Sequence, residues 1–311
     1  MKKGSPQLLN VQGVTFSSQD PNWAPNDFEQ FVHGSLSEEI AYSGTSPRKQ
    51  KSGRVFTASE INAQYPVPIH CEMAFLPKYP KEIHFYCKRA AVQGGETPLV
   101  DFRKVYADLP EEFRKRLHEK DVRYHRLYRS SRTKQRFNPA QLKTWEDLFG
   151  TNDKSEVEKQ CRELDQQFHW GKNNSLTISE TRPAFRFLED QATWTYFCQI
   201  ASFHPFAVIA EARKLFLRKK SFGSFRIYLA GIIFLGWRYR FSKPQSLAMY
   251  CSFGDGTKFT RREMNIVQDT IWKHAEYIRL KAGDVLSLDN RFVAHGRFPF
   301  RGEREIWVTW K

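Results

Sequence analysis

Short strand-like segments towards both ends of the chain, with helices between them, constrain the fold more than any other feature of the sequence. Strand-like pieces punctuated by proline begin after residue 54, and the strand pattern returns after residue 174. Two helices are predicted between these blocks, at about residues 110–120 and 154–168. The clearest strands are Val55–Thr57, Val67–His70, Asp284–Leu288, Phe292–Ala294 and Glu305–Trp310. This order predicts a single β-sandwich or barrel that carries a helical insertion.

The composition is that of a folded, basic protein. The chain has 311 residues, of which 40% are hydrophobic, so it can bury a sizeable core as one large domain or two small ones. Lys and Arg exceed Asp and Glu by 49 − 34, which gives a net charge of +15. This charge favours anionic partners, such as nucleic acid, an acidic membrane surface or acidic small molecules. Because the cations are scattered along the chain, we favour a generally basic surface and expect no nucleic-acid partner.

The cysteines indicate reduced thiols rather than a disulfide framework. They are odd in number, widely separated and without a Cys-x-x-Cys pair, which argues against both disulfides and a zinc site. The five are Cys71, Cys87, Cys161, Cys198 and Cys251. The first residues contain no apolar stretch typical of a signal peptide. We therefore expect an intracellular, cytoplasmic protein.

One apolar run, Ile227–Trp237, raises the question of a membrane. Its eleven residues are too few to cross a bilayer, which takes about 20 residues in a helix. We therefore predict a buried strand or helix and no membrane partner. The basic neighbours Arg226, Arg238 and Arg240 leave an interfacial segment as the alternative.

The first chemical motif is His70-Cys71-Glu72. On a strand, alternate side chains share a face, so His70 and Glu72 would lie together while Cys71 points away. An imidazole and a carboxylate are two ligands of a facial triad, and a second histidine would complete it with open positions left on iron(II). His-x-Glu alone is weak, because most such pairs are solvated surface residues.

Two further motifs gain weight from their order in the chain. Gly94-Gly95-Glu96-Thr97 permits a tight turn or a close approach of the backbone to a ligand, although an ordinary hairpin turn would look the same. His295 ends an apolar strand and is a candidate for the distal ligand, although a core histidine is the plainer interpretation. Arg304 precedes the last strand and could hold a dicarboxylate through a bidentate contact.

Together these motifs resemble the taurine dioxygenase and clavaminate synthase-like family of iron(II), 2-oxoglutarate-dependent oxygenases. The similar stretches are Tyr42–Arg48, Val55–Glu60, Ile69–Phe75, Pro80–Cys87, Gly94–Arg103 and Gly283–Trp307. The resemblance implies a double-stranded β-helix, or jelly roll, with helical insertions. A metal carboxylate from Glu rather than Asp is similar to the clavaminate synthase branch.

The resemblance also implies roles for individual residues. His70, Glu72 and His295 match the iron ligands and thus the catalytic centre, whereas Thr97 and Arg304 match contacts to the tail carboxylate of 2-oxoglutarate. Arg301 is the weaker candidate for that contact. The implied reaction consumes O2, converts 2-oxoglutarate to succinate and CO2, and hydroxylates a small acidic or amino-acid-like substrate, which a surplus arginine such as Arg297 or Arg301 would suit.

The sequence also departs from the family. Little precedes Gly13, so the N-terminal region is short, and residues 206–245 look like an atypical insertion within an otherwise single domain spanning 1–311. Two other functions stay open. One is an oxygenase of a nucleic acid or protein, suggested by the basic and aromatic stretch Arg123–Arg129. The other is a degenerate family member without catalysis. The oligomeric state is open too.

Overall fold

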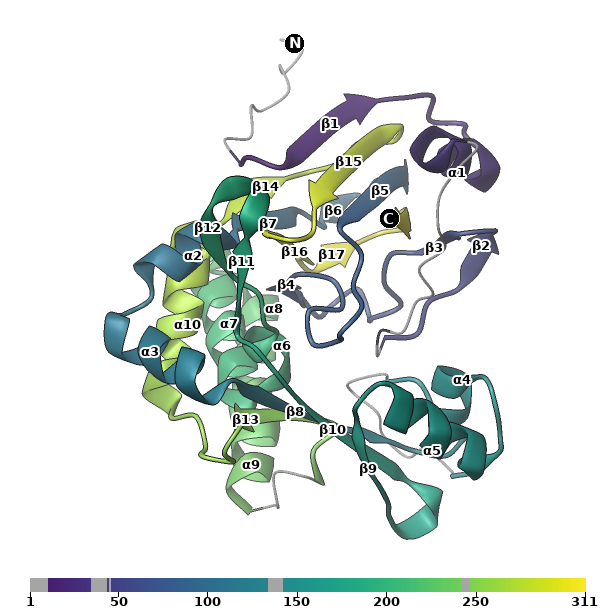
Figure 1. Cartoon of the computed structure of the whole chain (residues 1–311). Coiled ribbons are helices and arrows are strands. Elements are labelled where there is room, and N and C mark those ends of the chain that lie inside the picture. Colours follow the sequence, from purple (N-terminus) through teal and green to yellow (C-terminus); the bar gives the residue numbers. More distant parts are fainter. Residues whose placement is uncertain (1–10, 35–43, 45, 134–141, 242–245) are drawn as a thin grey trace.

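Two antiparallel sheets form the centre of the molecule (Figure 1). The computed structural model describes all residues except 1–10, 35–43, 45, 134–141 and 242–245. The larger sheet has the strand order β1 (Val14–Ser18), β15 (Asp284–Asp289), β5 (Glu82–Arg89), β18 (Glu305–Trp310), β3 (Val55–Thr57) and β2 (Gln50–Ser52). The smaller sheet has the order β14 (Glu276–Ile278), β7 (Thr97–Asp101), β16 (Val293–Arg297) and β4 (Val67–His70). Strands from the two ends of the chain therefore alternate in both sheets, as in the jelly roll that the sequence predicted.

The core lies between these two sheets. Phe85, Leu286 and Val308 of the larger sheet form one buried cluster with Leu99 and Val293 of the smaller sheet. Such interdigitation of inward-facing side chains is how two stacked sheets exclude water. Helix α1 (Pro25–His33) covers the outer face of the larger sheet, where its apolar side chains pack against those of β5 and β18.

A third sheet and two helices form the middle insertion. Its strands are β13 (Met249–Phe253), β8 (Val122–Tyr128), β10 (Leu176–Arg182) and β9 (Gln167–Trp170), and α4 (Trp145–Phe149) and α5 (Lys154–Glu163) pack on it. The predicted helix at 110–120 is confirmed as α3 (Glu111–Lys120). The predicted helix 154–168 is too long. Asp165 takes a positive φ of 53°, which ends the helical path, and Phe168 lies on β9 instead.

A helical layer covers the outer face of the smaller sheet (Figure 1). Ile69, Val100 and Ala294 of that sheet share a buried cluster with residues of the helices. The layer contains α2 (Phe102–Asp108), α6 (Ile200–Phe203), α7 (Pro205–Lys219) and α10 (Arg261–Lys273). Two separate two-stranded sheets are also present: the hairpin of β11 (Phe185–Leu188) and β12 (Thr193–Tyr196), and the pairing of β6 (Gln93–Gly94) with β17 (Phe300–Arg301).

The segment 206–245 divides into a packed part and an exposed part. Most of it up to residue 219 belongs to α7, whose Ala207 and Leu215 are buried. The second part is helical: α8 (Phe222–Ala230), a π-helical stretch (Gly231–Gly236) and α9 (Trp237–Phe241). The apolar run is thus helical, the second of the two predicted alternatives, but the prediction of burial is wrong, because Ile233, Phe234 and Trp237 are exposed among the residues that the structure describes. Among the described residues, no helix is both long and apolar enough to span a bilayer.

Glu211 of α7 is a carboxyl buried in the helical layer. Its side chain is 1% exposed, and neither carboxyl oxygen has a hydrogen-bond partner of good geometry among the described residues. Burial raises the pKa of Glu211 from 4.5 to about 8, and the nearby Gln268 amide and Ile69 backbone offset only part of that effect. The carboxyl is therefore protonated in the folded protein at neutral pH, whereas in the unfolded chain it is ionised.

This difference predicts a pH-dependent loss of stability. Since the folded state holds a proton that the unfolded state releases, the free energy of unfolding should fall as pH rises from about 4.5 to about 8, by at most about 1.4 kcal/mol per pH unit from this group. Glu211→Gln should remove that slope, while the exposed Glu163→Gln should retain it. Urea unfolding at several pH values measures this, and parallel curves for wild type and Glu211→Gln would contradict it.

Candidate metal centre

His70 and His295 face each other across two paired strands. His70 is the last residue of β4, and its Cα partner on β16 is His295. Their ring centroids lie 4.8 Å apart. Because β16 is bonded to β7 on its other side, His295 occupies the middle of the smaller sheet and His70 its edge strand. The register of one strand pair thus places both imidazoles at the same point.

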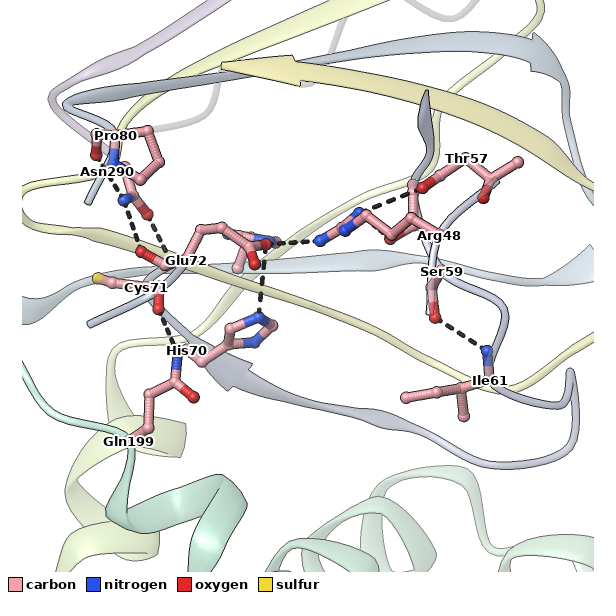
Figure 2. A network of polar contacts seen from close by, with 12 residues as sticks. Arg48, Thr57, Ser59, Ile61, His70, Cys71, Glu72, Pro80, Gln199 and Asn290 are labelled. Carbon is pink, nitrogen blue, oxygen red and sulfur yellow. Dashed lines mark hydrogen bonds and ion pairs between the residues drawn. The ribbon is translucent and has the colours of Figure 1, made fainter. Parts of the chain in front are cut away.

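Glu72 reaches the same point from a turn rather than from a strand. The sequence pattern predicted Glu72 on the same strand as His70. In the structure β4 ends at His70, and residues 72–75 form a turn in which Met73 has a φ of 56°. The carboxylate oxygen Oε2 lies 3.9 Å from His70 Nε2 and 4.0 Å from His295 Nε2. The three side chains therefore converge, as Figure 2 shows for His70 and Glu72, and Cys71 is buried away from them in the core.

The turn is held by side chains from distant parts of the chain (Figure 2). Asn290 is fully buried; its Oδ1 accepts a hydrogen bond from the Glu72 backbone N–H at 2.7 Å, and its Nδ2 donates to the Glu72 carbonyl at 3.0 Å. Gln199 Nε2 donates to the Cys71 carbonyl at 2.7 Å. Asn290 therefore binds both the N–H and the carbonyl of Glu72, so a side chain rather than a neighbouring strand satisfies the backbone at this residue.

Arg48 fixes the direction of the carboxylate itself. Its Nη2 donates to Glu72 Oε2 at 2.7 Å, and its Nη1 donates to the carbonyls of Thr57 and Ala58. Both side chains of the ion pair are about 95% buried, with relative exposures of 6% and 5%. A buried carboxylate without a cationic partner would be strongly unfavourable, and Arg48 is that partner for Glu72.

Both histidines are suited to bind a metal as neutral imidazoles. His70 Nδ1 lies 2.7 Å from the Pro68 carbonyl, a contact that requires a proton on Nδ1 and leaves the Nε2 lone pair available. Burial holds the pKa of His295 well below its ordinary value, and the nearby His70 and Arg48 lower it further. Its Nδ1 has no hydrogen-bond partner among the described residues.

The donor set fits a divalent transition metal. The ligand atoms of His70, Glu72 and His295 all lie within 4.8 Å of one another. Three ligand atoms on one face of an octahedral ion, each about 2.1 Å from it, lie about 3.0 Å apart, so these atoms would approach one another by up to about 1.8 Å when a metal binds. Two imidazoles and one carboxylate, on one side of the ion, are the ligands typical of a non-haem iron(II) site.

The glycine motif forms a turn beside Arg304. Gly94 and Gly95 both have positive φ values, 74° and 73°, as the sequence predicted for a tight turn. A Cβ on Gly95 would lie 3.3 Å from Arg304 Nε, so glycine leaves room for the guanidinium. Burial lowers the pKa of Arg304 to about 10, and no described carboxylate pairs with it. Thr97, which follows the turn, is buried at the start of β7.

The other two arginines of the C-terminal motif lie in different surroundings. Arg297 donates to the carbonyls of Ile61, Asn62 and Tyr65 at 2.8–3.0 Å, so it holds that loop. Arg301 is exposed on β17. Of the three arginines, therefore, only Arg304 is both largely buried and without a described carboxylate or carbonyl partner.

Sequence reasoning missed Arg48, Asn290 and Gln199 as parts of this centre. Arg48 and Asn290 lie in stretches that were recognised as family-like, Tyr42–Arg48 and Gly283–Trp307, and this similarity was the only signal that could have drawn attention to them. Their contacts span up to 218 positions of sequence, and no local spacing predicts such pairs.

Comparisons with known proteins agree on a family. The family described as taurine catabolism dioxygenase TauD, TfdA matches residues 6–193, which include His70, Glu72 and Thr97. The chain is 28% identical over 283 residues to the dapdiamide synthesis protein DdaC of Enterobacter agglomerans, covering 91% of this chain and 77% of that protein. It is 25% identical over 309 residues to a clavaminate synthase-like protein of Arabidopsis thaliana, covering 97% and 82%.

Solved structures with a similar course of the chain include one from Burkholderia xenovorans described as an alpha-ketoglutarate dependent 2,4-D dioxygenase. It is 13% identical, with a TM-score of 0.47, over 96% of this chain and 82% of that chain. The assignment rests on the family match, which spans more than half of the chain. The protein belongs to the TauD, TfdA family of 2-oxoglutarate-dependent dioxygenases.

Proposed function

We propose that the protein uses iron(II), 2-oxoglutarate and O2 to hydroxylate a small acidic or amino-acid-like substrate, with release of succinate and CO2. The convergence of His70, Glu72 and His295 within 4.8 Å carries this proposal. In it these three residues are the metal ligands and the catalytic centre, and residues 1–311 act as one oxygenase domain. Iron(II) and 2-oxoglutarate, when bound, supply the oxidising chemistry.

The chain contributes geometry and a dry environment. Asn290 and Arg48 fix Glu72 through its backbone and its carboxylate, and the Pro68 carbonyl fixes the ring of His70. Such outer contacts orient ligands and raise metal affinity, so their loss typically weakens binding about 10- to 100-fold.

Arg304 and Thr97 are proposed to bind the tail carboxylate of 2-oxoglutarate. Arg304 lies against the Phe300 ring, 5.5 Å from its centroid, and beside Gly95. A largely buried guanidinium without a protein carboxylate is a strong binding site for a ligand carboxylate. The hydroxyl of Thr97 would add a hydrogen bond from the strand that neighbours His295.

Arg186 is the arginine that we propose for the substrate carboxylate. It lies partly buried on β11 beside the adjoining rings of Tyr79 and Phe197, 4.3 and 4.7 Å from their centroids. Its Nη1 makes only a long hydrogen bond of 3.4 Å to the Tyr79 hydroxyl, and no described carboxylate pairs with it. Tyr79 belongs to the connection that follows Glu72, so this cation adjoins the loop that carries the metal ligand. An acidic or zwitterionic substrate suits such a site.

The contacts of Arg123–Arg129 weaken the argument for a nucleic-acid substrate. This stretch forms most of β8. Arg126 is fully buried in an ion pair with Glu180, and Arg123 donates to Gln167 at 2.7 Å. The buried Arg126 is not available to a phosphate, so part of the observation that suggested this partner reflects an internal structural role instead.

Metal and co-substrate binding tests the proposal directly. We expect anaerobic protein with iron(II) and 2-oxoglutarate to develop the weak visible charge-transfer band of a chelated 2-oxo acid. His70→Ala and His295→Ala should abolish the band, because each removes one of three ligands, while the exposed His169→Ala should keep it. A wild-type protein that binds neither iron(II) nor 2-oxoglutarate in calorimetry would instead indicate a degenerate, non-catalytic family member.

A second prediction separates the two candidate arginines. Arg304→Ala should weaken 2-oxoglutarate binding by more than about 100-fold, because loss of a buried charged partner typically costs about 3–5 kcal/mol. Arg301→Ala, on the exposed β17, should change it less than about threefold. Isothermal titration of the iron-loaded protein measures both. Equal effects, or the reverse order, would show that another cation holds the carboxylate.

A further inference from the structure

The outer face of the helix that runs from α8 to α9 is an exposed apolar surface. Most of its residues recur every three or four positions, the spacing of one helical face, with three in succession in the π-helical stretch, and their relative exposures range from 39% to 75%. We call this surface the apolar ridge; it consists of Phe222, Phe225, Leu229, Ile232, Ile233, Phe234, Trp237 and Phe241. Single exposed apolar side chains are common on proteins, but a continuous row of this length marks a binding surface.

The ridge belongs to a helix that is held in place by its inner face. Phe216 of α7 packs against the ring of Tyr228 at a centroid distance of 6.4 Å and against the inner side of Phe225 at 5.5 Å, so Phe225 lies at the border between the inner face and the ridge. Further along, Tyr239 packs against Phe206 and His204. The inner side of the helix thus packs against α7 and its N-cap residue His204, and the ridge lies on the opposite, exposed side.

The stretch of sequence that carries the ridge contains only positive charges, of which Lys214 and Lys219 pair with Asp269 and Glu96 from other elements. Between residues 212 and 254 the sequence contains no Asp or Glu. Nine cations lie in the same interval: Arg213, Lys214, Arg218, Lys219, Lys220, Arg226, Arg238, Arg240 and Lys243. Arg226 and Arg240 are exposed on the helix of the ridge itself. The partner must therefore combine an apolar interior with negative charge at its surface.

We propose that the apolar ridge docks the protein onto the surface of an anionic lipid bilayer. A helix with exposed Phe, Ile and Trp and flanking Arg lies in the plane of the interface, with its apolar face among the acyl chains and its cations at the headgroups. The apolar run is too short to span the membrane, which agrees with binding at one surface. A second copy of the chain fits less well, because it would bring two cationic rims together.

Vesicle binding of the full-length protein tests this inference. The probes are vesicles of phosphatidylcholine alone and of phosphatidylcholine with about 30% phosphatidylserine. We expect the protein to float with the anionic vesicles at least about tenfold more strongly than with the neutral ones, and to be released as salt is raised. Brominated lipids should quench part of the tryptophan fluorescence of wild type, and Trp237→Phe should lose that part.

Two variants and a matched control connect the binding to the ridge. Phe234→Ser/Trp237→Ser should lower binding at least about tenfold, because it removes the apolar contact. Arg226→Gln/Arg240→Gln should reduce the preference for phosphatidylserine. Val92→Ser/Phe187→Ser changes two exposed apolar residues elsewhere and should bind as wild type does. Thermal melting and iron(II) binding of each variant confirm that the fold is intact.

Three results would overturn the inference. The first is that wild type leaves both kinds of vesicle unbound. The second is equal binding to both kinds, or unchanged binding by Phe234→Ser/Trp237→Ser. The third is a dimer in solution that this double variant converts to a monomer, which would show that a second copy covers the ridge. None of these results bears on iron(II) or 2-oxoglutarate binding, so the proposed function is tested separately.

Discussion

The antiparallel pairing of β4 with β16 is the constraint on which the candidate site depends. It places His70 and His295 opposite each other, one on an edge strand and one in the middle of the smaller sheet. The two strands are separated by more than 200 residues of chain, so the site exists only when the jelly roll has closed. Asn290, in the turn between β15 and β16, binds the backbone of Glu72 and so brings the third ligand atom to the same place.

Burial gives these groups their chemical state. The imidazole of His295 stays neutral because a charged ring would be poorly solvated between the sheets. The carboxylate of Glu72 is buried in the same surroundings, and Arg48 pairs with it there. Arg304 differs from Arg48 in having no described carboxylate partner, which is why we assign it to the co-substrate rather than to the fold.

The sequence predicted the strands at both ends of the chain because each strand signal is local, whereas the three residues that converge were singled out by the resemblance to a family rather than by local pattern. It could not predict the turn after His70, since that turn depends on Asn290, 218 positions away from Glu72. It also overestimated the burial of Ile227–Trp237. Hydrophobic composition predicts a tendency to leave water, but whether protein, lipid or another chain covers the surface depends on the tertiary structure.

The central claim is that His70, Glu72 and His295 hold one iron(II) ion while Arg304 holds 2-oxoglutarate. The most direct measurement is an anaerobic crystal structure of the protein with both ligands, with anomalous scattering recorded at the iron edge. The account predicts one iron peak within about 2.3 Å of His70 Nε2, His295 Nε2 and a Glu72 oxygen, and a ligand carboxylate in bidentate contact with Arg304. Iron bound elsewhere, or a 2-oxoglutarate carboxylate on another residue, would contradict it.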